Sequence, residues 1–343
     1  MRRGERREAA VVQYSAARWC LFLGSSVLLT VQFYLLADIT RNNNNGSDDG
    51  TLRANIMSSS TSSLNSNGDD GDHPSTTTNM TFDQQTEWIR NYFHSADPNE
   101  QEWCVKAVTE GNYWMHGDYN GGSQFGGDGF ISRNMFWDYV VHSKKGFYVE
   151  AGANDYRHLS ATFMFDKCFG WEGLCIEPQK RYLDDLVTKR SCKTVQACLT
   201  KEKTDMMIGG MPAHRGAGAF IRPIPDDGKI PDRFEKVECA PLQEFLGQRT
   251  HVDLFVLDVE GAELPVLDTI DWQNTTFSVL QIETNKIKNH VLLNQDMLNR
   301  GYEKLYSIEA DTIYAPTKEK SRFPNSSEAW QPPGNILKLK QGE

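Results

Sequence analysis

The segment from Lys145 to Pro178 constrains the fold more than any other part of the chain. A short apolar strand runs into Glu150, and a tight turn that contains Gly152 follows it. A helix-like stretch comes next, and then a second strand that ends on Glu177. This order predicts the first βαβ unit of a Rossmann-like, nucleotide-binding sheet. Because the glycine lets backbone amides approach a cofactor and the second acid can accept from a ribose diol, the segment predicts an adenosine site.

The glycine turn also limits which cofactors the site is expected to bind. Gly152 stands without the G-x-G-x-x-G spacing of dinucleotide enzymes. An isolated glycine more often serves a simple strand-to-helix turn, but Glu177 follows 25 residues later, close to the spacing of a ribose acid. The pattern therefore disfavours NAD or FAD, and with them an oxidoreductase. It favours a cofactor without phosphates, such as S-adenosylmethionine.

Strands and helices alternate along the rest of the folded region, which predicts a doubly wound, mostly parallel sheet with its sites at the carboxyl ends of the strands. The run DLFVLDV is continuously apolar, as expected of a buried parallel strand. EKLYSIEADTIYAP is expected to close the sheet as an antiparallel hairpin. The predicted strands span 147–151, 173–177, 194–200, 253–259 and 278–284, with a variable insert at 201–232 and a strand-like stretch at 236–240.

Three motifs carry a resemblance to a known family. They are the turn EAGAN at 150–154, the stretch GWEGLCIEP at 170–178 and LDVEGAE at 257–263. In this order they resemble the FkbM-type S-adenosylmethionine-dependent methyltransferases, over roughly residues 130–316. The resemblance implies a class I methyltransferase fold with S-adenosylmethionine as cofactor. Many members have a glycine where this chain has Tyr156. A tyrosine at this position would crowd the methionine end of the cofactor or close the pocket differently.

The predicted sheet gathers the cofactor-binding candidates on one edge. Glu177 is the expected ribose acceptor. Glu150 and Asp155 would hold the ammonium group of the methionine moiety, directly or through water. Gly152 and Asn154 form the turn beneath the cofactor.

The candidates for catalysis follow the fourth strand. Asp258 would orient a substrate hydroxyl or accept its proton as a general base, with Glu260 beside it. The alternative is that one of these two acids caps the following helix, because acids favour helix amino termini. Glu263 is expected on the helix surface. The candidates for acceptor recognition are His214, Arg215 and Glu283.

The amino terminus predicts a membrane anchor. Residues 1–18 are a basic tail, and the apolar run 19–37 is long enough to cross a bilayer, so the positive-inside rule predicts a single-pass type II protein. The alternative is a cleaved signal peptide, which would give a secreted protein. Residues 38–80 are polar and predict a disordered stem. Residues 81–140 are expected to form an amino-terminal cap region, and 141–343 the methyltransferase domain.

Composition supports a lumenal compartment and excludes one class of partner. Apart from Cys20 the chain has six cysteines, enough for three disulfides in fifteen possible pairings or for some buried free thiols. Sequons at Asn45, Asn79, Asn274 and Asn325 fit lumenal exposure. No C-x-x-C or paired-histidine spacing occurs, so we expect no metal site. The net charge of −10 disfavours a nucleic-acid partner.

These features predict a Golgi- or ER-lumenal O-methyltransferase that uses S-adenosylmethionine and acts on a hydroxyl-bearing acceptor, a glycan or glycolipid. Its other expected partner is the membrane, through the amino-terminal helix. The competing hypothesis is a catalytically inactive methyltransferase-fold protein that serves as a lumenal binding or trafficking module. Tyr156 favours that alternative, whereas Glu177 and the intact LDVEG motif favour the enzyme.

Overall fold

The structure is a computed structural model that describes residues 84, 87, 89, 98–110, 122–209, 219–327 and 329. All of them belong to the compact unit His73–Glu343. The predicted basic tail, anchor and stem, with the sequons at Asn45 and Asn79, lie outside the described residues. Within the described ranges, none of the helices has both the length and the apolar character needed to cross a membrane.

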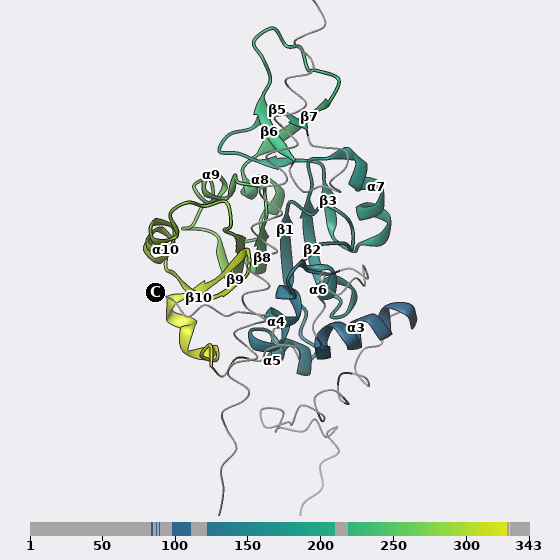
Figure 1. The fold of residues 1–343 in the computed structure, drawn as a ribbon, viewed down its shortest axis with the longest axis vertical. Helices are drawn as coiled ribbons and strands as arrows, with labels where there is room; N and C mark the ends of the chain where they lie inside the picture. The colour runs from purple at the N-terminus through teal and green to yellow at the C-terminus, as the bar shows by residue number, and fades with distance from the viewer. Residues whose placement is uncertain are drawn as a thin grey trace, which may run out of the picture. The chain divides into compact units, whose positions relative to one another are not determined.

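A seven-stranded mixed sheet forms the centre of the unit, as Figure 1 shows. Five neighbouring strands pair in parallel, and the strand between β9 and β10 runs antiparallel to both. The predicted mixed sheet and its terminal hairpin are thereby confirmed. In spatial order the strands are β10 (Tyr302–Ile308), β11 (Asp311–Pro316), β9 (Thr276–Glu283), β8 (His251–Leu257), β1 (Phe147–Ala151), β2 (Glu172–Ile176) and β3 (Lys193–Val195).

Helices connect the strands and cover the sheet. The connection from β1 to β2 passes through α6, and that from β2 to β3 passes through α7, so a helix links each pair of neighbouring parallel strands. Figure 1 shows α6 and α7 beside β2 and β3, and α9 and α10 beside β8 and β9. The helices are α3 (Pro98–Glu110), α4 (Gly127–Asn134), α5 (Trp137–Val141), α6 (Phe163–Lys167), α7 (Lys180–Lys189), α8 (Leu242–Leu246), α9 (Glu263–Leu267), α10 (His290–Asn299) and the 3-10 helix η3 (Thr317–Arg322).

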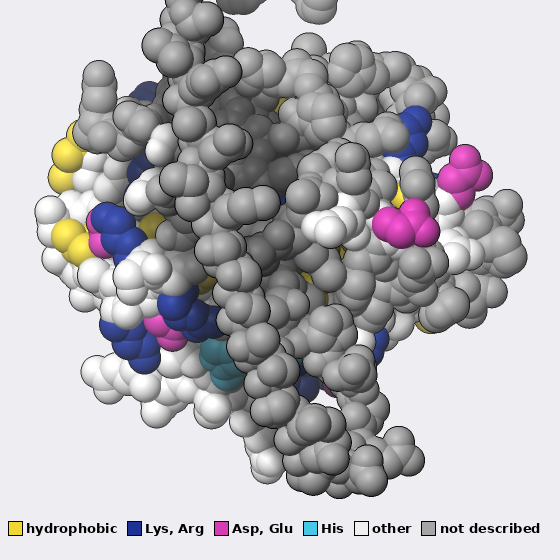
Figure 2. Space-filling model, turned by 90° about the horizontal axis from the view of Figure 1, so that it is seen from below, with side chains coloured by type: hydrophobic (Ala, Val, Ile, Leu, Met, Phe, Trp, Pro, Cys, Tyr) yellow, Lys and Arg dark blue, Asp and Glu magenta, His cyan; other side chains and the backbone are white. Residues whose placement is uncertain are grey.

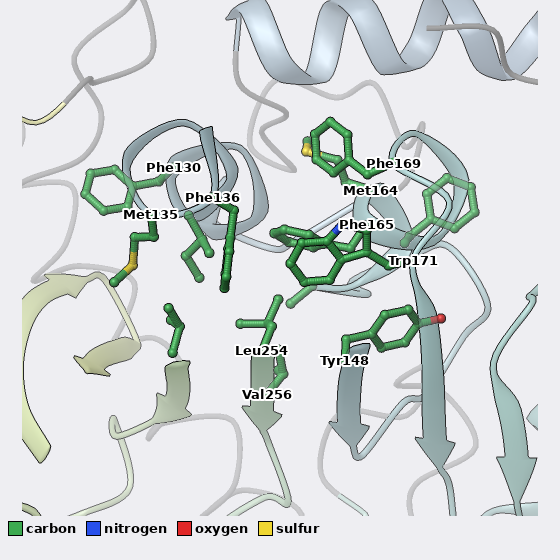
Figure 3. Packing of buried hydrophobic residues seen from close by; sticks show 14 of the residues in the cluster. Phe130, Met135, Phe136, Tyr148, Met164, Phe165, Phe169, Trp171, Leu254 and Val256 are labelled. Carbon is green, nitrogen blue, oxygen red and sulfur yellow. The ribbon is translucent and has the colours of Figure 1, made fainter. Parts of the chain in front are cut away.

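Two hydrophobic cores lie on the two faces of the sheet because strand side chains alternate between faces. Leu254 and Val256 of β8 pack into the core shared with α4 and α6, which Figure 3 shows, whereas Phe255 and Leu257 pack into the other. Trp171 lies at the centre of the first core, with its ring 4.9 Å from that of Phe136. Residues 252–257 are therefore buried on both faces, which explains the continuous apolar run.

One glycine in the second motif has a packing role. A Cβ atom on Gly173 would lie 2.2 Å from the ring of Tyr148 on the neighbouring strand. The register pairs these two residues directly, and Tyr148 is fully buried. A side chain at position 173 would displace that ring, so this glycine of the motif serves the core.

The insert is more ordered than the sequence suggests. Four strands form a second sheet in the order β4 (Cys198–Leu199), β7 (Phe234–Ala240), β5 (Thr204–Gly209) and β6 (Phe220–Pro223). The prediction of one strand over 194–200 was wrong, because the chain leaves the large sheet after Val195 and enters the small one at Cys198. A disulfide between Cys198 and Cys239 joins β4 to β7 at this transition.

All six cysteines outside the predicted anchor are paired. The disulfides are Cys104–Cys168, Cys175–Cys192 and Cys198–Cys239. The first attaches α3 to the end of α6, and the second lies between β2 and β3. The expectation of three disulfides is therefore confirmed, and the alternative of buried free thiols is wrong for these cysteines.

Candidate functional site

A cavity of about 460 Å³ lies at the carboxyl ends of β1, β2, β8 and β9, where the fold predicts a ligand site. Its apolar wall includes Ile176, Leu199 and, from the second sheet, Ile208 and Ile221. The other wall carries most of the polar groups. The polar and charged lining residues are Ser123, Gln124, Glu150, Asn154, Glu177, Gln179, Asp258, Glu260, Gln281, Glu283, Asn285, Lys286 and Asp311.

Gly152 allows two strand ends to meet beneath the cavity. Its φ is +85°, and a Cβ atom there would lie 1.8 Å from the backbone oxygen of Asp258. Its N–H donates to the carbonyl of Ile176 at 2.9 Å, and the N–H of Asp258 donates to Ala151 at 3.1 Å. The turn thus joins the ends of β1, β2 and β8, and any other residue at this position would separate them.

Glu177 closes the turn from the neighbouring strand and is buried, with 2% exposure. Its two carboxylate oxygens accept from the backbone N–H groups of Asn154 and Gln179, each at 2.7 Å. Burial raises its pKa to about 7, although these two hydrogen bonds oppose the shift. The Oδ1 atom of Asn154 is buried without a hydrogen-bond partner. Asn154 and Glu177 both line the cavity, so a buried carboxylate and an unpartnered amide oxygen belong to residues of its wall.

The two acids predicted to hold an ammonium group already accept hydrogen bonds from other groups of the protein. Glu150 lines the cavity, but its oxygens accept from the Ala161 N–H at 2.8 Å and the Thr162 hydroxyl at 2.7 Å. Asp155 accepts from the backbone N–H groups of Arg157 and His158 in its own turn. The structure places Asp155 outside the cavity lining, so this part of the prediction does not fit.

A second acidic group lies at the ends of β8 and β9. The side chains of Asp258, Glu283 and Asp311 line the cavity together. The side chain of Asp258 is open to the cavity, but protein atoms surround the cavity. This partial removal from solvent, together with the charges of Glu283 and Asp311, raises the pKa of Asp258 well above its usual value. Burial also raises the pKa of Asp311 to about 7. Like charges held this close resist simultaneous ionisation.

The helix-capping alternative for Asp258 and Glu260 does not match the structure. The N-cap residue of α9 is Ala262, and it makes no side-chain capping bond. Glu260 has φ +60° and forms an ion pair with Lys286. Glu263 accepts instead from the N–H groups of Val259 and Gly261, at 3.1 and 3.0 Å.

Three further predictions concern residues near the site. Glu263 was expected on the helix surface, which was wrong, because it is 1% exposed beneath the turn. Tyr156 does not line the cavity; its ring lies 6.3 Å from that of Phe163, and Lys189 lies over it. The prediction that Tyr156 crowds the site was therefore wrong. His214 and Arg215 lie outside the described residues.

Some site residues were missed from the sequence. Gln281 lies two positions before Glu283 on the same face of β9, and its Nε2 donates to Asp311 at 2.7 Å. Lys286 follows the strand and reaches Glu283 at 3.2 Å. Because side chains alternate between the two faces of a strand, the position of Gln281 two residues before Glu283 could have identified it as a site residue. Asp311 comes from the hairpin, and only the sheet order brings it beside Glu283.

The described surface elsewhere has mixed charge. Figure 2 shows basic side chains beside acidic ones on one face of the molecule. Ion pairs such as Arg300 with Asp268 and Lys320 with Glu303 follow this pattern. Such exposed pairs contribute little and mark no ligand.

The family comparison finds one match. Residues 150–304 match the model described as the methyltransferase FkbM domain, a range that holds the turn, Glu177, Asp258 and Glu283 but not Asp311. A search of curated proteins finds no match.

Two solved structures match parts of the chain at low identity and low TM-score. The methyltransferase FkbM from Methylobacillus flagellatus is 12% identical with a TM-score of 0.35, and the match covers 67% of this chain and 57% of that one. The chain thus spans little more than half the length of that protein. A precorrin-6y C5,15-methyltransferase from Geobacter metallireducens is 11% identical with a TM-score of 0.30, covering 50% of this chain and 79% of that one.

Proposed function

The chain carries a methyltransferase FkbM domain over residues 150–304, and from this premise we propose that it is an S-adenosylmethionine-dependent O-methyltransferase. The proposed acceptor is a hydroxyl of a glycan or glycolipid in the lumen of the Golgi or ER. The proposed topology is a single-pass type II membrane protein, or a secreted one if the anchor is cleaved. The basic tail and apolar run support the topology, and the paired cysteines support an oxidising compartment.

The cavity residues fit this cofactor. Glu177 would accept from a ribose diol in addition to its two backbone hydrogen bonds, and Oδ1 of Asn154 would be a further acceptor. The apolar side chains of Ile176 and Leu199 suit an uncharged aromatic ring. S-adenosylmethionine, when bound, supplies an activated methyl group on a sulfonium.

Apart from binding the cofactor, the protein would mainly position the acceptor hydroxyl. Asp258, which follows β8 and lines the cavity, would orient the acceptor hydroxyl. Ile208 and Ile221 of the second sheet would keep water from that space. Such a reaction depends mainly on alignment and needs no nucleophilic serine or cysteine.

The single observation that carries the proposal is the position of Glu177, buried at the end of β2 with its carboxylate in the wall of the cavity. Tyr156, on which the hypothesis of an inactive binding module depends, lies outside that wall. The enzyme is therefore the function we favour.

The test is transfer of a tritiated methyl group from S-adenosylmethionine by the full-length protein to a panel of glycans and glycolipids. We expect transfer to a hydroxyl, reduced about 100-fold or more by Asp258→Asn. The matched control is Asp253→Asn, which changes a buried carboxylate at the opposite end of β8. Folded protein that binds the cofactor but methylates none of these acceptors would exclude the proposed acceptor class. Protease protection of the domain in intact vesicles tests the topology separately.

A further inference from the structure

Three carboxylates from different elements converge beside the cavity. Asp258 follows β8, Glu263 begins α9 and Glu283 ends β9, and one oxygen from each lies within 4.8 Å of the others. Lys286 forms an ion pair with Glu283 at 3.2 Å and a second with Glu260. One ammonium group thus compensates only part of the negative charge at this end of the cavity.

Two buried oxygen atoms nearby have no hydrogen-bond partner among the described residues. One is Oε2 of Glu263, whose side chain is 1% exposed. The other is Oε1 of Gln281, which is 3% exposed, lines the cavity and projects from the same face of β9 as Glu283. A buried acceptor without a partner is unfavourable, so two of them beside an acidic cluster point to a ligand that supplies positive charge.

We propose that a divalent cation binds between Asp258, Glu263 and Glu283, with the Gln281 carbonyl oxygen completing or orienting the site. All of these ligands are oxygen atoms, three of them carboxylates. Hard cations such as Mg²⁺, Mn²⁺ and Ca²⁺ prefer such a set, whereas Zn²⁺ favours nitrogen and sulfur. The inference goes beyond methyl transfer and holds whether or not the cofactor binds.

The electrostatics of the cluster agree with this geometry. Burial, with the neighbouring charge of Glu283, raises the pKa values of Asp258, Glu263 and Asp311. Repulsion of this kind is relieved either by protons or by a metal ion.

The site has a consequence for acceptor recognition. Asp258 and Glu283 both line the cavity, whereas Glu263 lies behind its wall. A cation held by all three is therefore reached from the cavity side, where its remaining positions accept oxygen atoms of a substrate. Neighbouring hydroxyls, which carbohydrates present in pairs, provide such oxygens.

The experiment titrates Mn²⁺ into the full-length protein after chelator treatment, with binding followed by electron paramagnetic resonance and competition by Mg²⁺ and Ca²⁺. We expect one Mn²⁺ per chain at this site. Glu263→Gln and Glu283→Gln should each weaken binding at least about tenfold, because even indirect metal contacts are worth that much. The matched control is Glu244→Gln, an exposed carboxylate on α8 whose change should leave the affinity as it is.

Folding and cofactor binding are measured on the same samples, by thermal unfolding without metal and by titration with S-adenosylhomocysteine. Folded protein that takes up no Mn²⁺ overturns the inference, and so does Mn²⁺ binding that both cluster variants leave unchanged. Mn²⁺ binding that the variants weaken supports the site even if the cofactor fails to bind. That last result would reject the proposed function alone.

Discussion

Two groups of acids lie around the central sheet, and their surroundings differ. The first group is buried, whereas in the second Glu263 is buried, Glu283 is half-buried and Asp258 is exposed to the cavity. In the first group, Arg190 lies between Asp166 and Glu150, with nitrogen–oxygen distances of 2.7 and 3.5 Å and a side chain without solvent exposure. Hydroxyls of Tyr148 and Thr162 donate to the same carboxylates. Although burial opposes it, Arg190 holds the pKa of Asp166 below its usual value.

The second group has no arginine among its ion-pair partners in the described part of the chain. Of its members Asp258, Glu263 and Glu283, only Glu283 forms an ion pair among the described residues, with Lys286. Two acceptor atoms, Oε2 of Glu263 and Oε1 of Gln281, have no donor. Burial raises pKa values here instead. The difference indicates that the first group stabilises the fold, whereas the second keeps its capacity for a ligand.

The largest expected effect comes from removing the compensating charge of the first group. Arg190→Met leaves two carboxylates buried without their partner and should lower the free energy of unfolding by about 3–5 kcal/mol. Urea unfolding of the oxidised protein measures it. Arg249→Met serves as the control, because Arg249 pairs at 3.9 Å with the largely exposed Glu172 and should change stability by less than about 1 kcal/mol. An equally small loss in Arg190→Met would show that the first group does not support the fold.

A smaller effect should depend on pH through Glu177. Its folded pKa of about 7 lies above the ordinary value of 4.5, so the folded state holds this proton more tightly than the unfolded one. The stabilising contribution is complete below pH 4.5 and is lost as the pH rises to about 7. The loss is roughly 3 kcal/mol, since each pKa unit corresponds to about 1.4 kcal/mol.

The difference in unfolding free energy between wild type and Glu177→Gln, measured from pH 4 to 8, isolates this contribution. The wild type should lose stability relative to the variant across that window. A difference that stays constant with pH would show that burial does not perturb Glu177.

The smallest effect should have the opposite sign to the first. Asp311→Asn removes one negative charge beside Glu283 and keeps an oxygen for the Gln281 amide. With chelator present at pH 7.5, it should stabilise the protein by about 1 kcal/mol, because like-charge repulsion decreases. Thermal unfolding measures the shift. If Asp311→Asn instead destabilises the protein, the acids at the ends of β8 and β9 would support the fold as the Arg190 group does, and the two groups would not differ.

The sequence predicts the parts of this molecule that depend on local order. The strand, turn and strand around Gly152 and the acid at Glu177 follow from residues that are near neighbours in the chain. The buried run of β8 and the closing hairpin follow from apolar periodicity. These elements lie where the sequence places them, within one or two residues.

The parts that the sequence does not predict depend on long-range contacts. The second sheet pairs β4 with β7 at a sequence separation of 41 residues, and only the strand-like stretch 236–240 gives a local sign of it. The sequence predicts Glu263 on the helix surface, whereas in the structure it is buried and accepts from the N–H groups of Val259 and Gly261 in the preceding turn. Asp311 reaches the acidic group only because β11 inserts beside β9. The spacing of the cysteines and histidines likewise gives no sign of the cluster of Asp258, Glu263 and Glu283, which only the fold brings together.

The most direct test of the central claim is calorimetric titration of the full-length, oxidised protein with S-adenosylhomocysteine, beside Glu177→Gln and the matched Asp253→Asn. Asp253 also accepts a backbone N–H, that of Phe147 at 2.8 Å, but at the other end of the sheet. We predict one ligand per chain, with affinity about tenfold or more lower in Glu177→Gln and unchanged in Asp253→Asn, since a hydrogen bond to a charged group is worth about 1.5–3 kcal/mol. Folded protein that does not bind, or Glu177→Gln that binds as tightly as the wild type, would contradict the account.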